Sequence, residues 1–272
     1  MIHSLINMFS YTFMIRAIVV GVFVSLCSAL LGVSLVLKRY SMIGDGLSHV
    51  GFGALAVATA LGLSPLKVTV PVVILAAVLL LRLSEKSKLK GDSAIGIISV
   101  SAMAFGVISV SVSTGLNADL YSYLFGSILA MTSDDVTLSI VLSAAVLLLY
   151  VLFYNRIFAV TFDEDFAKAG GTSVQLYNML IAVLTAITIV LGMRMMGSLI
   201  ISALIIFPAI TSMRVCKSYK GVTVCSAILS VACFFIGIVI SFLYDLPTGA
   251  SRVAVNALML VLFMIVEKFL KR

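Results

Sequence analysis

Long apolar runs separated by short polar connectors make up most of this sequence of 272 residues. Most runs are close to the length of about 20 residues at which an α-helix crosses the hydrocarbon core of a bilayer. The pattern predicts an all-α polytopic membrane protein with eight or nine transmembrane helices, and it excludes a transmembrane barrel, whose strands show short alternating patterns. The expected spans lie, in chain order, at residues 11–37, 43–61, 68–83, 94–114, 136–154, 174–193, 197–213, 222–243 and 248–266.

One apolar segment is too short to cross the bilayer. It runs from Leu120 to Met131 ("LYSYLFGSILAM"). Asp119 bounds it on one side, and Asp134 with Asp135 bounds it on the other. We predict a half-helix or re-entrant segment here, because such a piece is tolerated only where protein or a water-filled cavity covers it. Eight crossings instead of nine result if one short element fails to span.

The composition agrees with a chain that lies mostly in lipid. Hydrophobic residues make up 62% of the sequence, charged residues only 11%, and the mean hydropathy is +1.25. A soluble domain carries about twice that share of charge, so we expect a single transmembrane domain over residues 1–272. The sequence has no G-x-x-x-x-G-K-[ST] motif and hence no P-loop ATPase of its own. Any energy input must come from an ion gradient or from a separate subunit.

The net charge of +7 indicates membrane topology rather than binding to nucleic acid, because cytoplasmic loops of membrane proteins collect lysine and arginine. We place the C-terminus and the loops after the first, third, fifth and seventh spans in the cytoplasm. The N-terminus then lies outside the cell, and the cytoplasmic side holds 14 of the 18 basic residues, namely Lys38, Arg39, Arg82, Lys86, Lys88, Lys90, Arg156, Lys168, Arg214, Lys217, Lys220, Lys268, Lys271 and Arg272.

An aspartate and a histidine stand near the start of the second expected span, in "MIGDGLSHVGFG". Asp45 and His49 are four residues apart, so a helix presents them one above the other on one face. The same face continues through Gly53, Ala56 and Ala60, small residues that let another helix or an ion pathway come close. An ionisable residue at membrane depth is energetically expensive and therefore marks a candidate functional site.

The chemistry of this pair suits a metal ion. Carboxylate oxygen and imidazole nitrogen together are suitable ligands for Zn²⁺ or Mn²⁺. One aspartate and one histidine are too few for a closed tetrahedral site, so a two-fold dimer, water or a backbone carbonyl has to complete the shell. In the alternative interpretation, Asp45 caps the second helix and His49 is a satisfied core residue. The spacing alone does not separate the two.

The connector from Thr161 to Val174 ("TFDEDFAKAGGTSV") is the most polar piece on the cytoplasmic side. Thr161 and Glu164 fit a capping box, and two glycines fit a C-cap. We predict a short helix across the inner face that carries two surface phenylalanines and suits docking into the groove of a partner. A plain surface loop is the alternative. The candidate docking residues are Phe162, Asp163, Glu164, Phe166, Ala167, Gly170 and Gly171.

Two further features stand towards the C-terminal end. Pro208, in "MMGSLIISALIIFPAIT", frees a backbone carbonyl and can kink its helix. Met193, Met195 and Met196 are interpreted as gap fillers rather than soft ligands, because Zn²⁺ and Mn²⁺ prefer nitrogen and oxygen donors. The stretch "YDLPTGASR" indicates a tight outer turn, in which Arg252 is a candidate partner for a carboxylate.

Five motifs occur in order along the chain: "GDGLSHVGFG", "DLYSYLFGSILAMT", "FDEDFAKAGG", "GSLIISALIIFPAITSMR" and "YDLPTGAS". Together they resemble the motifs of the ABC-3 family of metal-ion permeases, the membrane subunits of bacterial high-affinity zinc and manganese importers. The resemblance covers roughly Arg16 to Val266. Five ordered motifs are far more specific than any one alone.

The resemblance implies a fold like that of the vitamin-B12-type (type II) ABC importer permease, in the bacterial inner membrane. It also implies a dimer of permease chains, expected to be a homodimer, with two cytoplasmic ABC ATPase subunits and an extracytoplasmic metal-binding protein. By the same resemblance, Asp45 and His49 match the Asp and His of the family's transport path, and "FDEDFAKAGG" matches the coupling helix that docks on the ATPase. The metal is then a transported substrate rather than a cofactor, and the chain is not itself an enzyme.

One position departs from the family pattern. Many zinc-type members carry an acidic residue after "LFG", where this sequence has Ser127. If that acid helps to attract or pass the ion, this protein does so less, or it uses Asp119, Asp134 or Asp135 instead. The matches around "DLYSYLFG" and "MMGSLIISALIIFPA" favour the zinc branch, so we expect Zn²⁺ rather than Mn²⁺.

Two other functions are alternatives to an ATP-driven metal importer. An intramembrane metalloenzyme needs further protein ligands and a base near Asp45 and His49. The only other histidine is His3, at the terminus on the opposite side, and no H-E-x-x-H motif exists. A gradient-driven metal carrier needs no ATPase, and the predicted docking helix argues against it.

Overall fold

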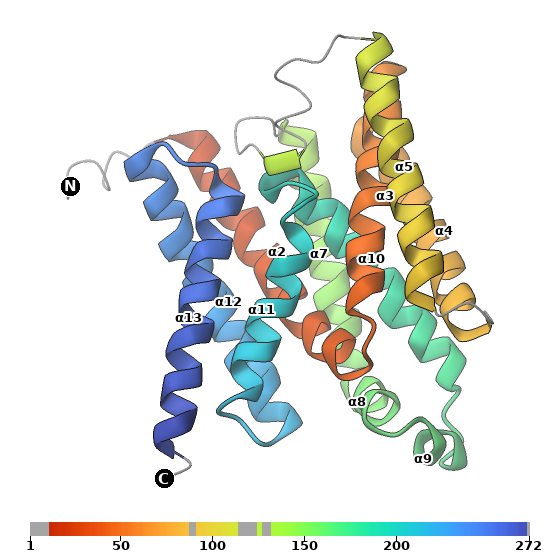
Figure 1. Ribbon diagram of the computed structural model, residues 1–272, viewed down its shortest axis with the longest axis vertical. Coiled ribbons are helices and arrows are strands. Elements are labelled where there is room, and N and C mark those ends of the chain that lie inside the picture. The colour runs from red at the N-terminus through yellow and green to blue at the C-terminus, as the bar shows by residue number, and fades with distance from the viewer. Residues whose placement is uncertain (1–10, 87–90, 114–123, 127–131, 271–272) are drawn as a thin grey trace.

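The computed structural model describes residues 11–86, 91–113, 124–126 and 132–270. These residues form a bundle of helices (Figure 1). In chain order the helices are α2 (Thr12–Leu37), α3 (Ser41–Ala60), α4 (Pro65–Lys86), α5 (Gly91–Ser113), α7 (Ser133–Leu152), α8 (Tyr154–Phe162), α9 (Glu164–Ala169), α10 (Val174–Met196), α11 (Ile201–Met213), α12 (Tyr219–Tyr244) and α13 (Thr248–Leu270).

Seven of the described helices are long and apolar enough to cross a membrane: α2, α4, α5, α7, α10, α12 and α13. Two others complete the pattern. α3 has 20 residues but is less apolar, because it carries Asp45, His49 and several glycines. α11 is apolar but has only 13 residues. With α3 and α11 the described part of the chain matches the nine predicted runs, and the predicted polytopic all-α membrane fold is confirmed.

α2 and α10 form the centre of the bundle. In the most apolar stretch of each helix, protein buries 67% of α2 and 78% of α10, but only 22% of α5 and 28% of α13. The outer helices stay apolar on their exposed faces, as Val100 and Phe105 of α5 illustrate. Lipid tails are as apolar as leucine, so an apolar side chain on the outside of a membrane bundle carries no penalty.

Polar residues mark where several helices begin. At α7 the Thr132 hydroxyl accepts a hydrogen bond from the Asp135 amide, and the Asp135 carboxylate accepts one from the Thr132 amide, both at 3.2 Å. At α12 the Ser218 hydroxyl accepts a hydrogen bond from the Gly221 amide at 3.1 Å. Pro65 opens α4, where a helix leaves its first amides unpaired in any case. These signals are local and therefore readable from sequence.

Two glycines allow the chain to pass close to itself beside the end of α10. Gly126 and Gly197 have φ angles of 81° and 87°, in the region that side chains with a Cβ rarely adopt. A Cβ on Gly126 would lie 2.4 Å from the Met195 carbonyl oxygen, and one on Gly197 would lie 2.2 Å from the Leu124 carbonyl oxygen. The described residues 124–126 therefore pack on the connection between α10 and α11. The rest of the half-helix predicted over residues 120–131 lies outside the described residues.

Candidate functional site

Asp45 and His49 lie on one face of α3, as their spacing predicts. His49 Nε2 is 3.6 Å from Asp45 Oδ2. The side chain of Asp45 is 43% exposed and that of His49 is 18% exposed, so both remain accessible. Asp45 does not cap α3, because the N-cap residue is Tyr40 and the first turn holds no acidic residue. The capping interpretation of the pair is therefore wrong.

α11 contributes a third polar side chain to this pair. The hydroxyl of Ser202 donates a hydrogen bond to Asp45 Oδ1 at 3.0 Å. One carboxylate oxygen of Asp45 is thus held by Ser202, while the other faces His49. The sequence did not indicate Ser202 as a partner of Asp45, because Ser202 is 157 residues away and stands in an apolar stretch, where it is one of several small residues suited to close helix contact. Only the packing of α11 on α3 brings it to the site.

The second ring nitrogen of His49, Nδ1, is buried and has no hydrogen-bond partner within the described part of the chain. A neutral imidazole keeps one nitrogen lone pair free, and this is the form that binds metal ions. No cluster of three or more His, Cys, Asp or Glu side chains suited to a metal occurs among the described residues. The pair therefore offers a carboxylate and an imidazole from one chain, which is an open and incomplete ligand set.

The small residues around His49 serve close helix packing. A Cβ on Gly53 would lie 2.4 Å from the carbonyl oxygen of Ala102 on α5. A Cβ on Gly51 would lie 2.3 Å from the Met193 methyl carbon on α10. The predicted close approach of a neighbour to this face is confirmed, and the neighbour is a helix. Met193 fills the gap beside Gly51, in agreement with its interpretation from sequence.

The four positions that the sequence offered as secondary candidates on an ion path, three aspartates and one serine, differ in their surroundings. Asp119 and Ser127 lie outside the described residues. Asp134 is exposed in the first turn of α7. Asp135 Oδ2 accepts a hydrogen bond from Arg194 at 2.8 Å, and only 14% of the Asp135 side chain is exposed. Since Asp135 also caps α7, the surrounding structure already engages its charge, and Asp134 is the more accessible of the two.

The connector between α7 and α10 folds as two short helices, α8 and α9. α8 continues through Thr161 to Phe162, and Asp163 is the N-cap of α9. Asp163 Oδ1 accepts a hydrogen bond from the Phe166 amide at 2.9 Å. The predicted capping box from Thr161 to Glu164 is therefore wrong. Thr161 keeps helical backbone, whereas Asp163 adopts the extended conformation that an N-cap requires.

The surface of the connector agrees with the prediction. Phe162 and Phe166 are 77% and 74% exposed, while Ala167 is buried. Gly170 is the C-cap of α9, and Gly171 follows with a φ of 77°. The two exposed aromatic side chains are therefore Phe162 at the end of α8 and Phe166 on α9, and α9 lies at one end of the bundle (Figure 1).

The sequence matches the family described as "ABC 3 transport family" over residues 10–267. "Manganese import system permease protein ScaB" of Streptococcus gordonii is 30% identical over 265 residues, which cover 96% of this chain and 95% of that protein. "High-affinity zinc uptake system membrane protein ZnuB" of Haemophilus influenzae is 29% identical over 246 residues, which cover 90% of this chain and 94% of that protein.

Two solved structures share the arrangement of helices. A chain of PsaBC from Streptococcus pneumoniae in complex with Fab aligns with a TM-score of 0.87 and 29% identity, covering 97% of this chain and 95% of that chain. A metal-chelate type ABC transporter in an inward-facing conformation aligns with a TM-score of 0.73 and 16% identity, over 93% of this chain and 85% of that chain. The second likeness concerns the fold alone. The fold of an ABC importer permease, expected from the sequence, is confirmed.

Proposed function

The chain belongs to the ABC 3 transport family, and from this premise we propose that it is the permease subunit of an ATP-driven importer that carries Zn²⁺ into the cytoplasm. A permease hydrolyses no ATP, so a separate ATPase subunit supplies the energy. The metal ion is cargo that must leave again, not a resident cofactor. The names of ScaB and ZnuB support a permease for divalent metal ions, and the preference for zinc rests on the chemistry of the site.

The observation that carries this proposal is the Asp45–His49 pair. Ser202 holds one oxygen of Asp45, which leaves the other oxygen and the His49 imidazole for an ion. Two donor groups hold an ion weakly, which suits a pathway. A two-fold pair of permease chains would bring two aspartates and two histidines together. Four such donors are the number that a tetrahedral Zn²⁺ shell takes.

The imidazole nitrogen favours Zn²⁺ over Mn²⁺. At a given nitrogen- or oxygen-donor site the affinity for divalent first-row metals rises along the series from Mn²⁺ to Cu²⁺, and Zn²⁺ stands above Mn²⁺. Mn²⁺ is better served by shells of oxygen ligands alone. Since half of the donor groups in the pair are nitrogen ligands, we expect this protein to select Zn²⁺.

In our proposal α8, α9 and the end of α13 face the cytoplasm and the start of α2 faces outward. The distribution of basic residues supports this orientation, and the start of α2 and the end of α13 lie at opposite ends of the bundle (Figure 1). A cytoplasmic ABC ATPase dimer then meets α9, and an extracytoplasmic metal-binding protein meets the other end. A second copy of this chain completes the pathway.

We further propose that α9, with its flanking residues, is the coupling helix that docks on the ATPase. Phe162 and Phe166 offer two exposed aromatic anchors, which suit a groove in a partner. Asp163 caps the helix and so keeps it formed at the surface. The turn at Gly170 and Gly171 ends it before α10 begins.

The test is uptake of radiolabelled zinc by cells that express the chain with its ATPase and delivery protein. His49→Ala should reduce uptake by at least about tenfold, which corresponds to the loss of roughly 1.4 kcal/mol of ion binding. Thr59→Ala, a truncation at the far end of the same helix, is the matched control and should leave uptake unchanged. Amounts of each variant in the membrane are compared by immunoblot.

The competing outcomes separate the parts of the proposal. Unlabelled Mn²⁺ that competes as well as unlabelled Zn²⁺ would overturn the zinc preference. Full uptake by His49→Ala would remove His49 from the ion path. Uptake that persists without the ATPase subunit would overturn ATP-driven transport.

A further inference from the structure

A tight turn that begins at Lys38 joins α2 to α3. The Tyr40 amide donates a hydrogen bond to the Leu35 carbonyl oxygen at 2.8 Å, and Arg39 has a φ of 59°. α3 begins directly after Tyr40. Because this turn is short and hydrogen-bonded, a displacement of Lys38 also displaces the first residues of α3, the helix that carries Asp45.

The side chain of Lys38 reaches into the corner between α8 and α9. Its Nζ donates a hydrogen bond to the Val160 carbonyl oxygen at 2.9 Å and one to Glu164 Oε1 at 2.5 Å. Only 4% of the Lys38 side chain is exposed, against 48% of the Glu164 side chain. A buried ammonium group needs partners of this kind because desolvation of an unpaired charge is costly.

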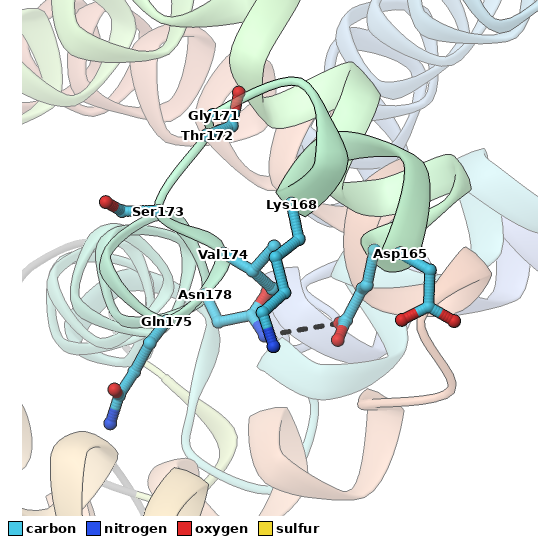
Figure 2. Close-up of a pocket in the computed structure, with 9 residues that line it drawn as sticks. Asp165, Lys168, Gly171, Thr172, Ser173, Val174, Gln175 and Asn178 are labelled. Carbon is cyan, nitrogen blue, oxygen red and sulfur yellow. Dashed lines mark hydrogen bonds between the residues drawn. The ribbon is translucent and has the colours of Figure 1, made fainter.

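Glu164 connects the same corner to a third helix. Its Oε1 also accepts a hydrogen bond from Asn178 Nδ2 on α10 at 3.2 Å, and Figure 2 shows this bond across the groove between α9 and α10. Burial raises the pKa of the Glu164 carboxyl, but the hydrogen bonds from Lys38 and Asn178 outweigh burial and hold the pKa below its usual value. One charged oxygen therefore ties α2, α9 and α10 together.

We propose that the Lys38–Glu164 ion pair carries movement of α9 to the start of α3, and hence to Asp45 and His49. This inference rests on the proposed function, in which α9 docks on the ATPase and Asp45 holds the ion. Lys38 and Glu164 are positioning residues, since neither touches the ion. α9 has six residues and packs mainly on α8 and α10, so the ion pair gives it a direct polar contact with α2.

If the ion pair had only a structural role, its loss would reduce the amount of folded permease or of its complex with the ATPase, and the number of ions moved per ATP would not change. Neither charge-removing variant leaves the buried ammonium without an acceptor, because Lys38→Met removes the ammonium and Glu164→Gln keeps an amide oxygen that can accept its hydrogen bond. Removal of either charge should therefore leave the folded permease and its complex with the ATPase intact. What changes, if the pair transmits movement, is the number of ions moved in each ATPase cycle.

The experiment measures zinc ions imported per ATP hydrolysed by the complete transporter in proteoliposomes with the delivery protein. Lys38→Met and Glu164→Gln each remove one charge, and Lys38→Arg keeps it. The matched control is Arg214→Gln, because Arg214 forms an ion pair with Glu267 at 3.4 Å that does not involve α9. Co-purification with the ATPase is measured for every variant.

We expect the ratio to fall at least about fivefold in Lys38→Met and in Glu164→Gln, as for the loss of an ordinary coupling interaction between two sites. Lys38→Arg should retain most of the wild-type ratio, and Arg214→Gln should retain all of it. The double variant Lys38→Met/Glu164→Gln should fall no further than either single variant, because both changes remove the same link.

An unchanged ratio in both single variants would overturn the proposal. So would additive losses in the double variant, or a loss of ATPase co-purification, which would assign the pair to assembly. A wild-type transporter that imports manganese instead of zinc would overturn the zinc preference alone. The same ratio measured with manganese would then test the link.

Discussion

Arg252 and Asp45 are both ionisable residues inside helices of the bundle, but Arg252 is buried and Asp45 is partly exposed. Only 2% of Arg252 is exposed, whereas 43% of the Asp45 side chain is exposed. The Arg252 guanidinium donates hydrogen bonds to Ser25 Oγ at 2.8 Å and to the Met196 sulfur at 2.5 Å, and it lies 4.7 Å from the centre of the Phe234 ring. Asp45 has far less packed around it.

The charge of Arg252 therefore helps to pack helices against one another, whereas the charge of Asp45 remains accessible to an ion. Arg252 on α13 contacts α2, α10 and α12, and it forms no ion pair with a carboxylate among the described residues. Within the described residues the carboxylate partner that the sequence suggested for it is therefore not found, and the Phe234 ring contacts the guanidinium through a cation–π contact instead. Asp45 keeps one oxygen turned toward His49.

Arg252→Ala should have the largest effect, on stability. Truncation removes the stem and the guanidinium from a packed site and should lower the free energy of unfolding by about 3 kcal/mol. Arg252→Met keeps the stem without the charge and should cost less than about 1 kcal/mol. The measurement is denaturant unfolding in mixed micelles, with the exposed Arg16→Ala as control. Uptake that is lost in well-folded Arg252→Met would instead make Arg252 part of the ion path.

Asp45→Asn should reduce zinc uptake but leave the stability of the fold unchanged, the opposite of what we expect for Arg252→Ala. The amide oxygen still accepts the hydrogen bond from Ser202, but the side chain no longer carries a charge for a divalent cation. Zinc uptake should fall by roughly tenfold, or about 1.4 kcal/mol, while the thermal unfolding midpoint stays near that of the wild type. The two measurements are uptake by cells and thermal unfolding in detergent. A variant that unfolds early would place Asp45 in the same structural class as Arg252.

Ser202→Ala should have the smallest effect. It removes one hydrogen bond to a charged oxygen that remains partly exposed, so uptake should fall by about threefold, corresponding to the loss of about 0.6 kcal/mol. Ser202→Thr keeps a hydroxyl and should recover most of the loss. Uptake at a series of zinc concentrations distinguishes weaker ion binding from less protein. An effect of Ser202→Ala on protein amount alone would show that Ser202 only packs α11 against α3.

The helices themselves could be predicted from the sequence because their causes are local. Each apolar run has to satisfy its own backbone hydrogen bonds in lipid, so its length and composition predict a helix without reference to the rest of the chain. The i, i+4 spacing of Asp45 and His49 places them on one face for the same reason. The exposed positions of Phe162 and Phe166 also follow from the short polar connector that carries them.

The N-cap of α9 is a feature that the local sequence predicted wrongly. Thr161 and Asp163 are both good N-cap residues, and the sequence favours Thr161 through the glutamate three positions later. The buried side chains of Ile157 and Val160 pack α8 onto the bundle and carry that helix through Thr161. Asp163 therefore becomes the first residue free to adopt extended backbone. Tertiary packing decided between two caps of similar quality.

The sequence was sufficient for the membrane class, the helical runs, the Asp45–His49 pair and the family resemblance. The tertiary structure alone revealed the partners of these groups: Ser202 is 157 residues from Asp45, and Glu164 is 126 residues from Lys38. The physical reason is that a lipid environment acts on each helix separately, through length and apolarity. The choice of partner depends on which faces of distant helices pack together, and no short stretch of sequence carries that information.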